Sequence, residues 1–223
     1  MAAAPQPSGY GFAGDSHTAN MAAISQTNAF DTADFYYRAQ RLTDFKTHNL
    51  HRLVLTYPDT KAIVYSFSND IDSLHLRNNP NGITKIADTL THLAIDTMEL
   101  GVLPFIISPI PRTITRSTLS IHEILHIKTQ LEHKIKTNTQ RECGYEVLID
   151  LNDITRLHFD GVHLTEGAYT TALHRCTQHI QDTLEAKNRK HRQQTEKNDA
   201  TQRAGLANPF RLMTLDEDEK TRD

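Results

Sequence analysis

A serine, an asparagine and an Asp-x-x-His pair are the residues of this chain whose types suit nucleophilic chemistry. Ser16 stands in the stretch GDSH after a short apolar run, and Asn69 stands in SND after another. Asp160 and His163 lie three residues apart in DGVHLTEG. A serine hydroxyl is a weak nucleophile until a base takes its proton, and a histidine held by a carboxylate can be that base. The four residues together predict nucleophilic catalysis, with the Ser16 backbone N–H and the Asn69 amide as donors to an oxyanion.

Each of these residues also has a structural interpretation when it is taken alone. Ser16 suits the cap of a helix that follows it, and Asp160 suits the cap of a helix-entry turn. Asn69 beside Asp70 is an ordinary pair for a turn. The catalytic interpretation therefore depends on whether the fold brings the four side chains together.

Strand-like and helix-like segments alternate along the chain. The predicted helices cover residues 18–30, 40–55, 81–100, 119–135 and a segment from Glu166 past Leu184; the predicted strands cover residues 9–14, 33–39, 61–67, 102–108 and 145–151. This alternation predicts a parallel sheet with helices on both faces. Ligands of such sheets bind beyond the carboxyl ends of the strands, which is where the GDSH, SND and LHFDGVHL stretches fall.

Local signals place the ends of two of these helices. Thr18 is the expected N-cap of the first helix. Gly101 is expected to end the helix over 81–100, whose apolar residues recur at helical spacing. They are Ile83, Ile86, Leu90, Leu93 and Met98.

Length and composition bound the remaining possibilities. The 223 residues carry a net charge of −3, which gives no general attraction to nucleic acid, so we expect the domain not to bind it. The two cysteines, Cys143 and Cys176, make a poor disulfide framework and fit a reducing compartment. No signal peptide or membrane span is recognisable. We expect an intracellular, cytoplasmic protein.

The hydrophobic fraction of 38% is low for a wholly globular chain, which indicates that part of it is solvated. We expect a flexible N-terminus over 1–8, one domain over 9–186, and a polar, disordered tail over 187–223. The basic stretch KNRKHR in that tail is too short to assign to nucleic acid. The tail also carries an apolar cluster, which suits a short protein-binding segment or packing on the chain's own domain. Its members are Phe210, Leu212, Met213 and Leu215.

A second motif suggests a different chemistry. Residues 122–126 read HEILH, and His-x-x-x-His on a helix with a glutamate between can bind zinc in a peptidase. Glu142 and Glu146 are available as a third ligand. The alternative is a solvated helix face on which His122, Glu123, His126 and His133 meet water. The apolar side of the same helix is then made of Ile121, Ile124, Leu125 and Leu131. The context favours the solvated face, so we expect no metal.

The blocks GDSH, SND and DGVHLTEG, in this order and after these strands, resemble the SGNH or GDSL hydrolase family over about residues 9–185. The resemblance implies a flavodoxin-like three-layer α/β/α sandwich with a parallel five-stranded sheet. It also implies hydrolysis of small carboxylic esters with a short acyl group, such as acetyl, through an acyl-serine intermediate and without a cofactor. By this resemblance Ser16 is the nucleophile, His163 the base, Asp160 its orienting carboxylate and Asn69 an oxyanion donor. The tail is faintly similar to segments of esterase domains carried by non-LTR retrotransposons.

The sequence departs from the family pattern at two places. The family has a glycine after the second strand whose N–H completes the oxyanion hole, but no glycine lies between Gly14 and Gly82 here, so Ala39 is the expected substitute. Phe67 stands where the family has the glycine of Gly-x-Asn-Asp, and its ring is expected to narrow the acyl pocket. His17, and His158 further along the chain, are expected as pocket walls. These departures leave a second hypothesis open, namely a fold kept as a binding or scaffold module without useful turnover.

Overall fold

A computed structural model of the chain describes residues 9–27, 33–110, 119–154 and 160–206. Its centre is a five-stranded sheet in the order β2-β1-β3-β4-β5, in which every paired strand is parallel to its neighbour. The strands are β1 (Tyr10–Gly14), β2 (Tyr36–Arg38), β3 (Ala62–Ser66), β4 (Leu103–Ile107) and β5 (Leu148–Ile149). The parallel five-stranded sheet predicted from the alternation is confirmed.

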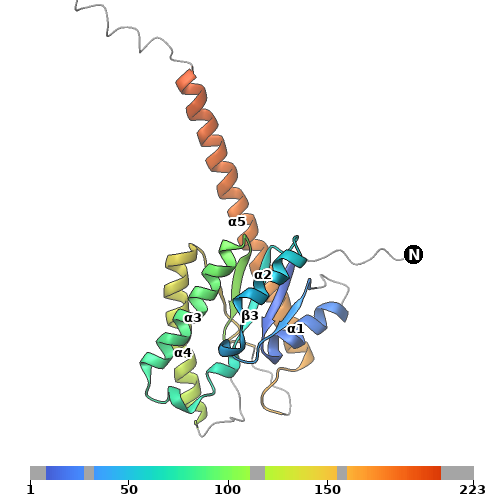
Figure 1. The fold of residues 1–223 in the computed structure, drawn as a ribbon, viewed down its shortest axis with the longest axis vertical. Coiled ribbons are helices and arrows are strands. Elements are labelled where there is room, and N and C mark those ends of the chain that lie inside the picture. The colour runs from blue at the N-terminus through green and yellow to red at the C-terminus, as the bar shows by residue number, and fades with distance from the viewer. Residues whose placement is uncertain (1–8, 28–32, 111–118, 155–159, 207–223) are drawn as a thin grey trace, which may run out of the picture. The chain divides into compact units, whose positions relative to one another are not determined.

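Helices cover both faces of this sheet (Figure 1). One face carries a continuous core cluster to which α2, α3 and α4 contribute, with α3 and α4 side by side. On the other face Phe105 of β4 contacts His179 of α5, and α1 packs against β1. The helices are α1 (Ser16–Thr27), α2 (Thr47–Thr56), α3 (Pro80–Glu99), α4 (Ile121–Cys143) and α5 (Glu166–Leu206), with 3-10 turns η1 (Leu42–Asp44), η2 (Ser68–Asp70) and η3 (Leu74–Leu76). The fold is the predicted three-layer α/β/α sandwich.

The strand sequences explain why the sheet is covered on both sides. All residues of β1, β3 and β4 are buried. Ile63 and Tyr65 of β3 join the core cluster on one face, and Val64 between them is equally buried. Such strands read as continuous apolar runs because neither face meets water. Their carboxyl ends lie together at one edge of the sheet, which positions the loops discussed below.

Several predicted boundaries differ from the structure. The segment over 40–55 forms η1 and then α2, with Phe45 and Lys46 between them. Thr18 is not the cap of α1, because the helix begins at Ser16 and the Thr18 hydroxyl donates to the Asp15 carbonyl. The helix predicted over 119–135 continues to Cys143, because its core-facing apolar residues recur as far as that cysteine. Gly144, with φ of 73°, then ends it.

The chain divides into two compact units, Met1–Ile180 and Gln181–Asp223. The part of α5 that belongs to the second unit continues to Leu206, so helix extends beyond the predicted change to a disordered tail near Lys187. From Lys187 to Gln202 every side chain is exposed, which agrees with the polar sequence. The N-terminal residues 1–8 and the apolar cluster around Phe210 lie outside the described residues.

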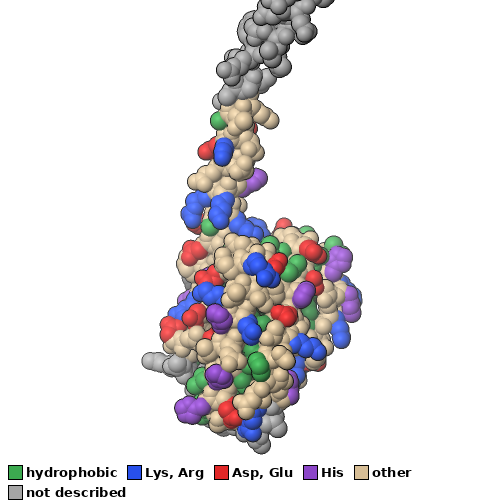
Figure 2. Space-filling model, turned by 90° about the vertical axis from the view of Figure 1, so that its left-hand side faces the viewer, with side chains coloured by type: hydrophobic (Ala, Val, Ile, Leu, Met, Phe, Trp, Pro, Cys, Tyr) green, Lys and Arg blue, Asp and Glu red, His purple; other side chains and the backbone are tan. Residues whose placement is uncertain are grey.

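The surface of the first unit mixes charges of both signs. Figure 2 shows lysine, arginine, acidic and histidine side chains interspersed over one face of it. Both cysteines are buried, and neither is part of a disulfide. Among the described helices, none combines the length and the apolar character that crossing a bilayer requires.

Candidate active site

The turn between β1 and α1 presents Ser16 at the start of a helix. Gly14 makes this turn possible: its φ is 131°, and a Cβ there would lie 1.9 Å from the Ser66 carbonyl oxygen of β3. Asp15 is fully buried, and its carboxylate accepts the backbone N–H of His17 at 3.1 Å and of Asn69 at 3.3 Å. The same carboxylate therefore caps α1 and ties the loop after β3 to the loop after β1.

Ser16, His163 and Asp160 form one hydrogen-bonded chain. The Ser16 Oγ lies 3.0 Å from His163 Nε2, and His163 Nδ1 lies 2.6 Å from Asp160 Oδ2. The other Asp160 oxygen accepts the backbone N–H groups of Val162 at 2.9 Å and of His163 at 3.0 Å. The sequence places His163 and Ser16 147 positions apart, and the parallel sheet brings them together.

Hydrogen bonding keeps Asp160 ionised. The His163 side chain, followed by the two backbone N–H groups, holds the pKa of the Asp160 carboxyl well below its usual range. An ionised carboxylate that accepts at Nδ1 favours the tautomer with its proton on that nitrogen, which leaves Nε2 to accept from Ser16. About a third of each side chain, 34% for His163 and 35% for Asp160, is exposed. The His163 side chain is therefore reachable by an incoming molecule.

Asn69 lies in η2, beside the Ser16 turn. Its side-chain nitrogen donates to the Gln40 carbonyl at 2.9 Å, which fixes the orientation of the amide. The neighbouring Asp70 is buried and accepts the Leu42 N–H, with its nearer oxygen at 3.2 Å. Burial raises the pKa of Asp70 to about 6, although the Leu42 N–H works in the opposite direction.

Ala39 does not occupy the place expected for a third oxyanion donor. Its N–H donates to the Gly14 carbonyl at 2.8 Å, so Ala39 extends the pairing of β1 with β2. The next residue, Gln40, lines the cavity above Ser16, and no described residue accepts its N–H. Among the described residues after β2, the first backbone N–H without a bonded acceptor is therefore that of Gln40, one residue later than the sequence suggested.

A cavity of about 370 Å³ opens above Ser16. Tyr36 stands in one wall, where its hydroxyl donates to the Gly14 carbonyl at 3.2 Å, and burial raises its pKa. The lining residues are Asp15, Ser16, Ala19, Tyr36, Arg38, Gln40, Asn69, Val162 and His163. Three of the four residues that the sequence selected, Ser16, Asn69 and His163, line this cavity, and the fourth, Asp160, contacts His163 without lining it.

Two residues expected in the pocket wall lie elsewhere. Phe67 is buried in the core, with its ring centroid 6.4 Å from that of Tyr65, because it continues the inward-facing alternation of β3. His17 is buried behind His163, with 5.8 Å between the ring centroids, and its Nδ1 lies 2.8 Å from the Tyr169 hydroxyl. His17 therefore packs against His163 from the interior. His158 lies outside the described residues.

Sequence reasoning missed Tyr36, Arg38 and Gln40. The signal was present, because FYYRAQ alternates between residues that turn inward and residues that turn outward, as a half-buried strand does. Phe35 and Ala39 are buried, whereas Arg38 and Gln40 are exposed. The outward set of this edge strand forms the wall of the cavity.

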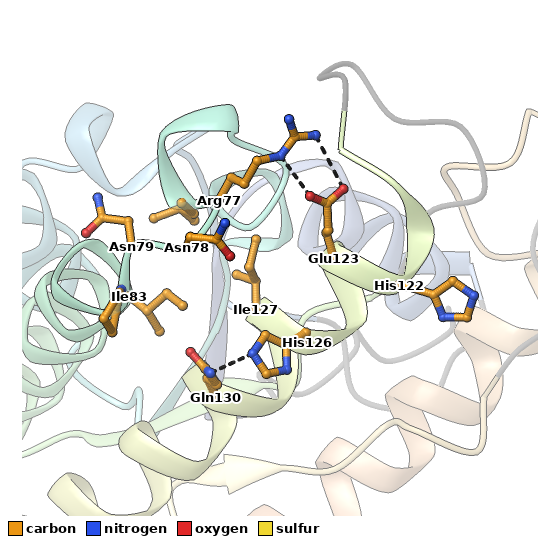
Figure 3. A pocket seen from close by; sticks show the side chains of 11 residues that line it. Arg77, Asn78, Asn79, Ile83, His122, Glu123, His126, Ile127 and Gln130 are labelled. Carbon is orange, nitrogen blue, oxygen red and sulfur yellow. Dashed lines mark hydrogen bonds and ion pairs between the residues drawn. The ribbon is translucent and has the colours of Figure 1, made fainter.

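The HEILH motif at the start of α4 takes part in local structure (Figure 3). Glu123 completes a capping box with Ser120 and pairs with Arg77, whose Nε lies 2.7 Å from its carboxylate. His126 meets Gln130 at 2.8 Å, and His122, His126 and His133 are exposed as expected. In the described part of the chain, no three His, Cys, Asp or Glu side chains gather closely enough to hold a metal ion.

The apolar side predicted for this helix is partly wrong. Ile124 and Leu131 are buried, but Ile121 is 45% and Leu125 39% exposed. The helix turns Ile127 and Lys128 inward instead, and the Lys128 ammonium is buried against Glu132. Two of the four side chains expected on the apolar side of this helix, Ile121 and Leu125, therefore face water.

Comparison with solved structures finds this fold among esterases. An acylhydrolase candidate from Bacteroides fragilis is 15% identical with a TM-score of 0.59, covering 78% of this chain and 87% of its own. A GDSL-like lipase from Bacteroides thetaiotaomicron is 13% identical with a TM-score of 0.57, covering 78% of this chain and 88% of its own. A carbohydrate acetylesterase from Sinorhizobium meliloti is 13% identical with a TM-score of 0.54, covering 79% of this chain and 98% of its own.

No protein-family model matches the sequence, and no curated protein matches it. The structural likeness is consequently a likeness of fold. The chain has the α/β fold of the SGNH hydrolases, as its sequence blocks predicted.

Proposed function

We propose that this protein is a serine esterase that hydrolyses short-chain carboxylic esters, acetyl esters among them, through an acyl-serine intermediate. The observation that carries the proposal is the chain from Ser16 Oγ through His163 to Asp160, with contacts of 3.0 and 2.6 Å. The carbohydrate acetylesterase of the same fold supports an ester as the substrate.

The first half of the reaction acylates Ser16. Its Oγ attacks the ester carbonyl carbon while its proton passes to His163 Nε2, and Asp160 stabilises the imidazolium that results. The bond from the carbonyl carbon to the alcohol oxygen then breaks, and His163 returns the proton to that leaving oxygen. A water molecule attacks the acyl-serine by the same route, and the carboxylic acid leaves as Ser16 recovers its proton.

Three donors are proposed for the oxyanion. They are the backbone N–H of Ser16 at the start of α1, the side-chain amide of Asn69, and the backbone N–H of Gln40. Donors of this kind are fixed before the reaction begins, so they stabilise the developing charge without reorganising. The contact of the Asn69 amide with the Gln40 carbonyl supports this arrangement because it holds two of the three groups together.

The test compares the wild type with Ser16→Ala on 4-nitrophenyl acetate and butyrate, together with fluorophosphonate labelling. Turnover and labelling of the wild type, both absent from Ser16→Ala, are expected. Ser73→Ala is the matched control, because Ser73 also contacts a histidine, His75 at 2.6 Å, but lies outside the cavity. That control should retain full activity.

A folded wild type inert to both esters and to the label would overturn the esterase proposal. The second candidate, a binding or scaffold module, would then stand, and the observation that favours it is the absence of a free N–H at Ala39. Whether the apolar cluster near Phe210 binds a protein partner would then be the first property to test.

A further inference from the structure

The wall of the cavity contributed by β2 carries a cation. Tyr36, Arg38 and Gln40 alternate along this edge strand and face the same cavity as Ser16 and His163. The Cα of Arg38 is the register partner of Gly14, two residues before Ser16. Paired strands lie about 5 Å apart, so the Arg38 side chain starts one strand away from the nucleophile and is long enough to reach over it.

No acidic side chain neutralises Arg38 within the described part of the chain. Arg77, Arg141 and Arg175 each pair with a carboxylate, whereas no residue in the described ranges forms an ion pair or a hydrogen bond with the Arg38 guanidinium. The two carboxylates nearest the site are already engaged. Asp15 accepts two backbone N–H groups. Asp160 contacts the Nδ1 atom of the His163 ring and accepts two further backbone N–H groups.

We propose that this cavity selects esters that carry a carboxylate close to the ester group, and that Arg38 is the residue that recognises it. The inference rests on the proposed esterase function. A guanidinium presents a planar set of donors that matches a carboxylate in two parallel hydrogen bonds. A water-exposed arginine contributes little binding free energy to a neutral substrate. The preference of the cavity among esters should therefore depend on a charged group of the substrate.

The position of Arg38 leaves open which part of the ester carries the charge, so the test uses two matched pairs of substrates. In monoethyl glutarate against its carboxamide the charge lies on the acyl part, and in 4-acetoxybenzoate against 4-acetoxybenzamide it lies on the alcohol part. Each pair differs only by carboxylate against amide. Hydrolysis is followed by pH-stat for the wild type and for Arg38→Gln, Arg38→Lys and Arg52→Gln.

The wild type should hydrolyse the carboxylate member of at least one pair with about tenfold higher kcat/KM, as a charge-assisted hydrogen bond allows. In Arg38→Gln this ratio should fall to about one, and Arg38→Lys should keep part of it because it retains charge without the planar fork. Arg52→Gln removes the same charge from the exposed face of α2 and should keep the ratio.

Three results would overturn the inference. One is a wild type that hydrolyses both members of each pair equally, which leaves the esterase function intact. Another is a preference for the carboxylate substrate that Arg38→Gln retains or that Arg52→Gln also loses, since the preference would then come from the overall electrostatic field of the protein. The third is a wild type that neither turns over any ester nor reacts with a fluorophosphonate, which removes the esterase proposal as well.

Discussion

Replacing Asp160 by asparagine tests the proposed catalytic chain at its most constrained contact. One oxygen of Asp160 accepts two backbone N–H groups, at 2.9 and 3.0 Å, and the other faces His163 Nδ1 at 2.6 Å. In Asp160→Asn the two N–H groups will hold the amide oxygen, so the NH2 group will face Nδ1. Nδ1 must then accept a hydrogen bond from that NH2 group, so the imidazole proton moves to Nε2. A protonated Nε2 cannot take the proton of Ser16.

The wrong tautomer should lower kcat for 4-nitrophenyl acetate by about 10⁴-fold, the order seen when a triad carboxylate is changed to its amide in another protein. Asp160→Ala leaves Nδ1 to water, so both tautomers remain accessible and the loss should be nearer about 10²-fold. Asparagine should therefore be worse than alanine, although it is the closer replacement in shape.

The assay measures kcat and the rate of fluorophosphonate labelling for both variants, with circular dichroism to confirm folding. Asp59→Asn, at an exposed turn after α2, is the control for losing one surface charge and should match the wild type. If Asp160→Ala proved as slow as Asp160→Asn, the tautomer argument would be refuted. If both variants turned over like the wild type, Asp160 would not orient His163 at all.

Four further predictions follow from the same contacts. Gly14→Ala should lower the free energy of unfolding in urea by about 3 kcal/mol or more, whereas Gly167→Ala, where a Cβ meets nothing within 4 Å, should leave it nearly unchanged. Asn69→Ala should lower kcat by about 100- to 1,000-fold at unchanged stability. Gln40→Pro should cost a similar factor, and Gln40→Ala, which keeps the N–H, should cost little; equal losses would contradict a backbone role. Because the folded pKa of Asp70 lies above its unfolded value, the free energy of unfolding should fall by up to about 3 kcal/mol between pH 4 and pH 6, and Asp70→Asn should abolish that fall in pH-dependent urea titrations.

The sequence alone was enough to predict the placement of those site residues whose positions depend only on the order of the strands. Ser16, Asn69 and His163 each follow a strand, and in a parallel sheet the carboxyl ends of all strands lie at one edge. Their convergence in one cavity needs no knowledge of register. The fold class also needs no knowledge of register, so the alternation of strands and helices along the chain was enough to predict it.

The residues that the sequence misplaced depend on register and on where a strand ends. Whether Ala39 or Gln40 offers its N–H depends on how far β2 stays paired with β1, and the extra bond to Gly14 settles that in favour of Gln40. Phe67 follows the last residue of β3 and still faces inward, which a nominal strand boundary cannot reveal. The length of α5 was underestimated because exposed polar residues are compatible with both helix and coil.

The missing glycine after β2 is best understood through backbone conformation. A glycine is required where φ is positive or where a Cβ would collide, as at Gly14. Among the described non-glycine residues, Asn78 has a positive φ, and Ala39 and Gln40 do not. The turn after β2 therefore needs no glycine in this chain, and a side chain at Gln40 leaves its N–H in place. The absence of glycine from this stretch then argues for an altered cavity wall, with Arg38 and Gln40 in it, rather than for the loss of an oxyanion donor.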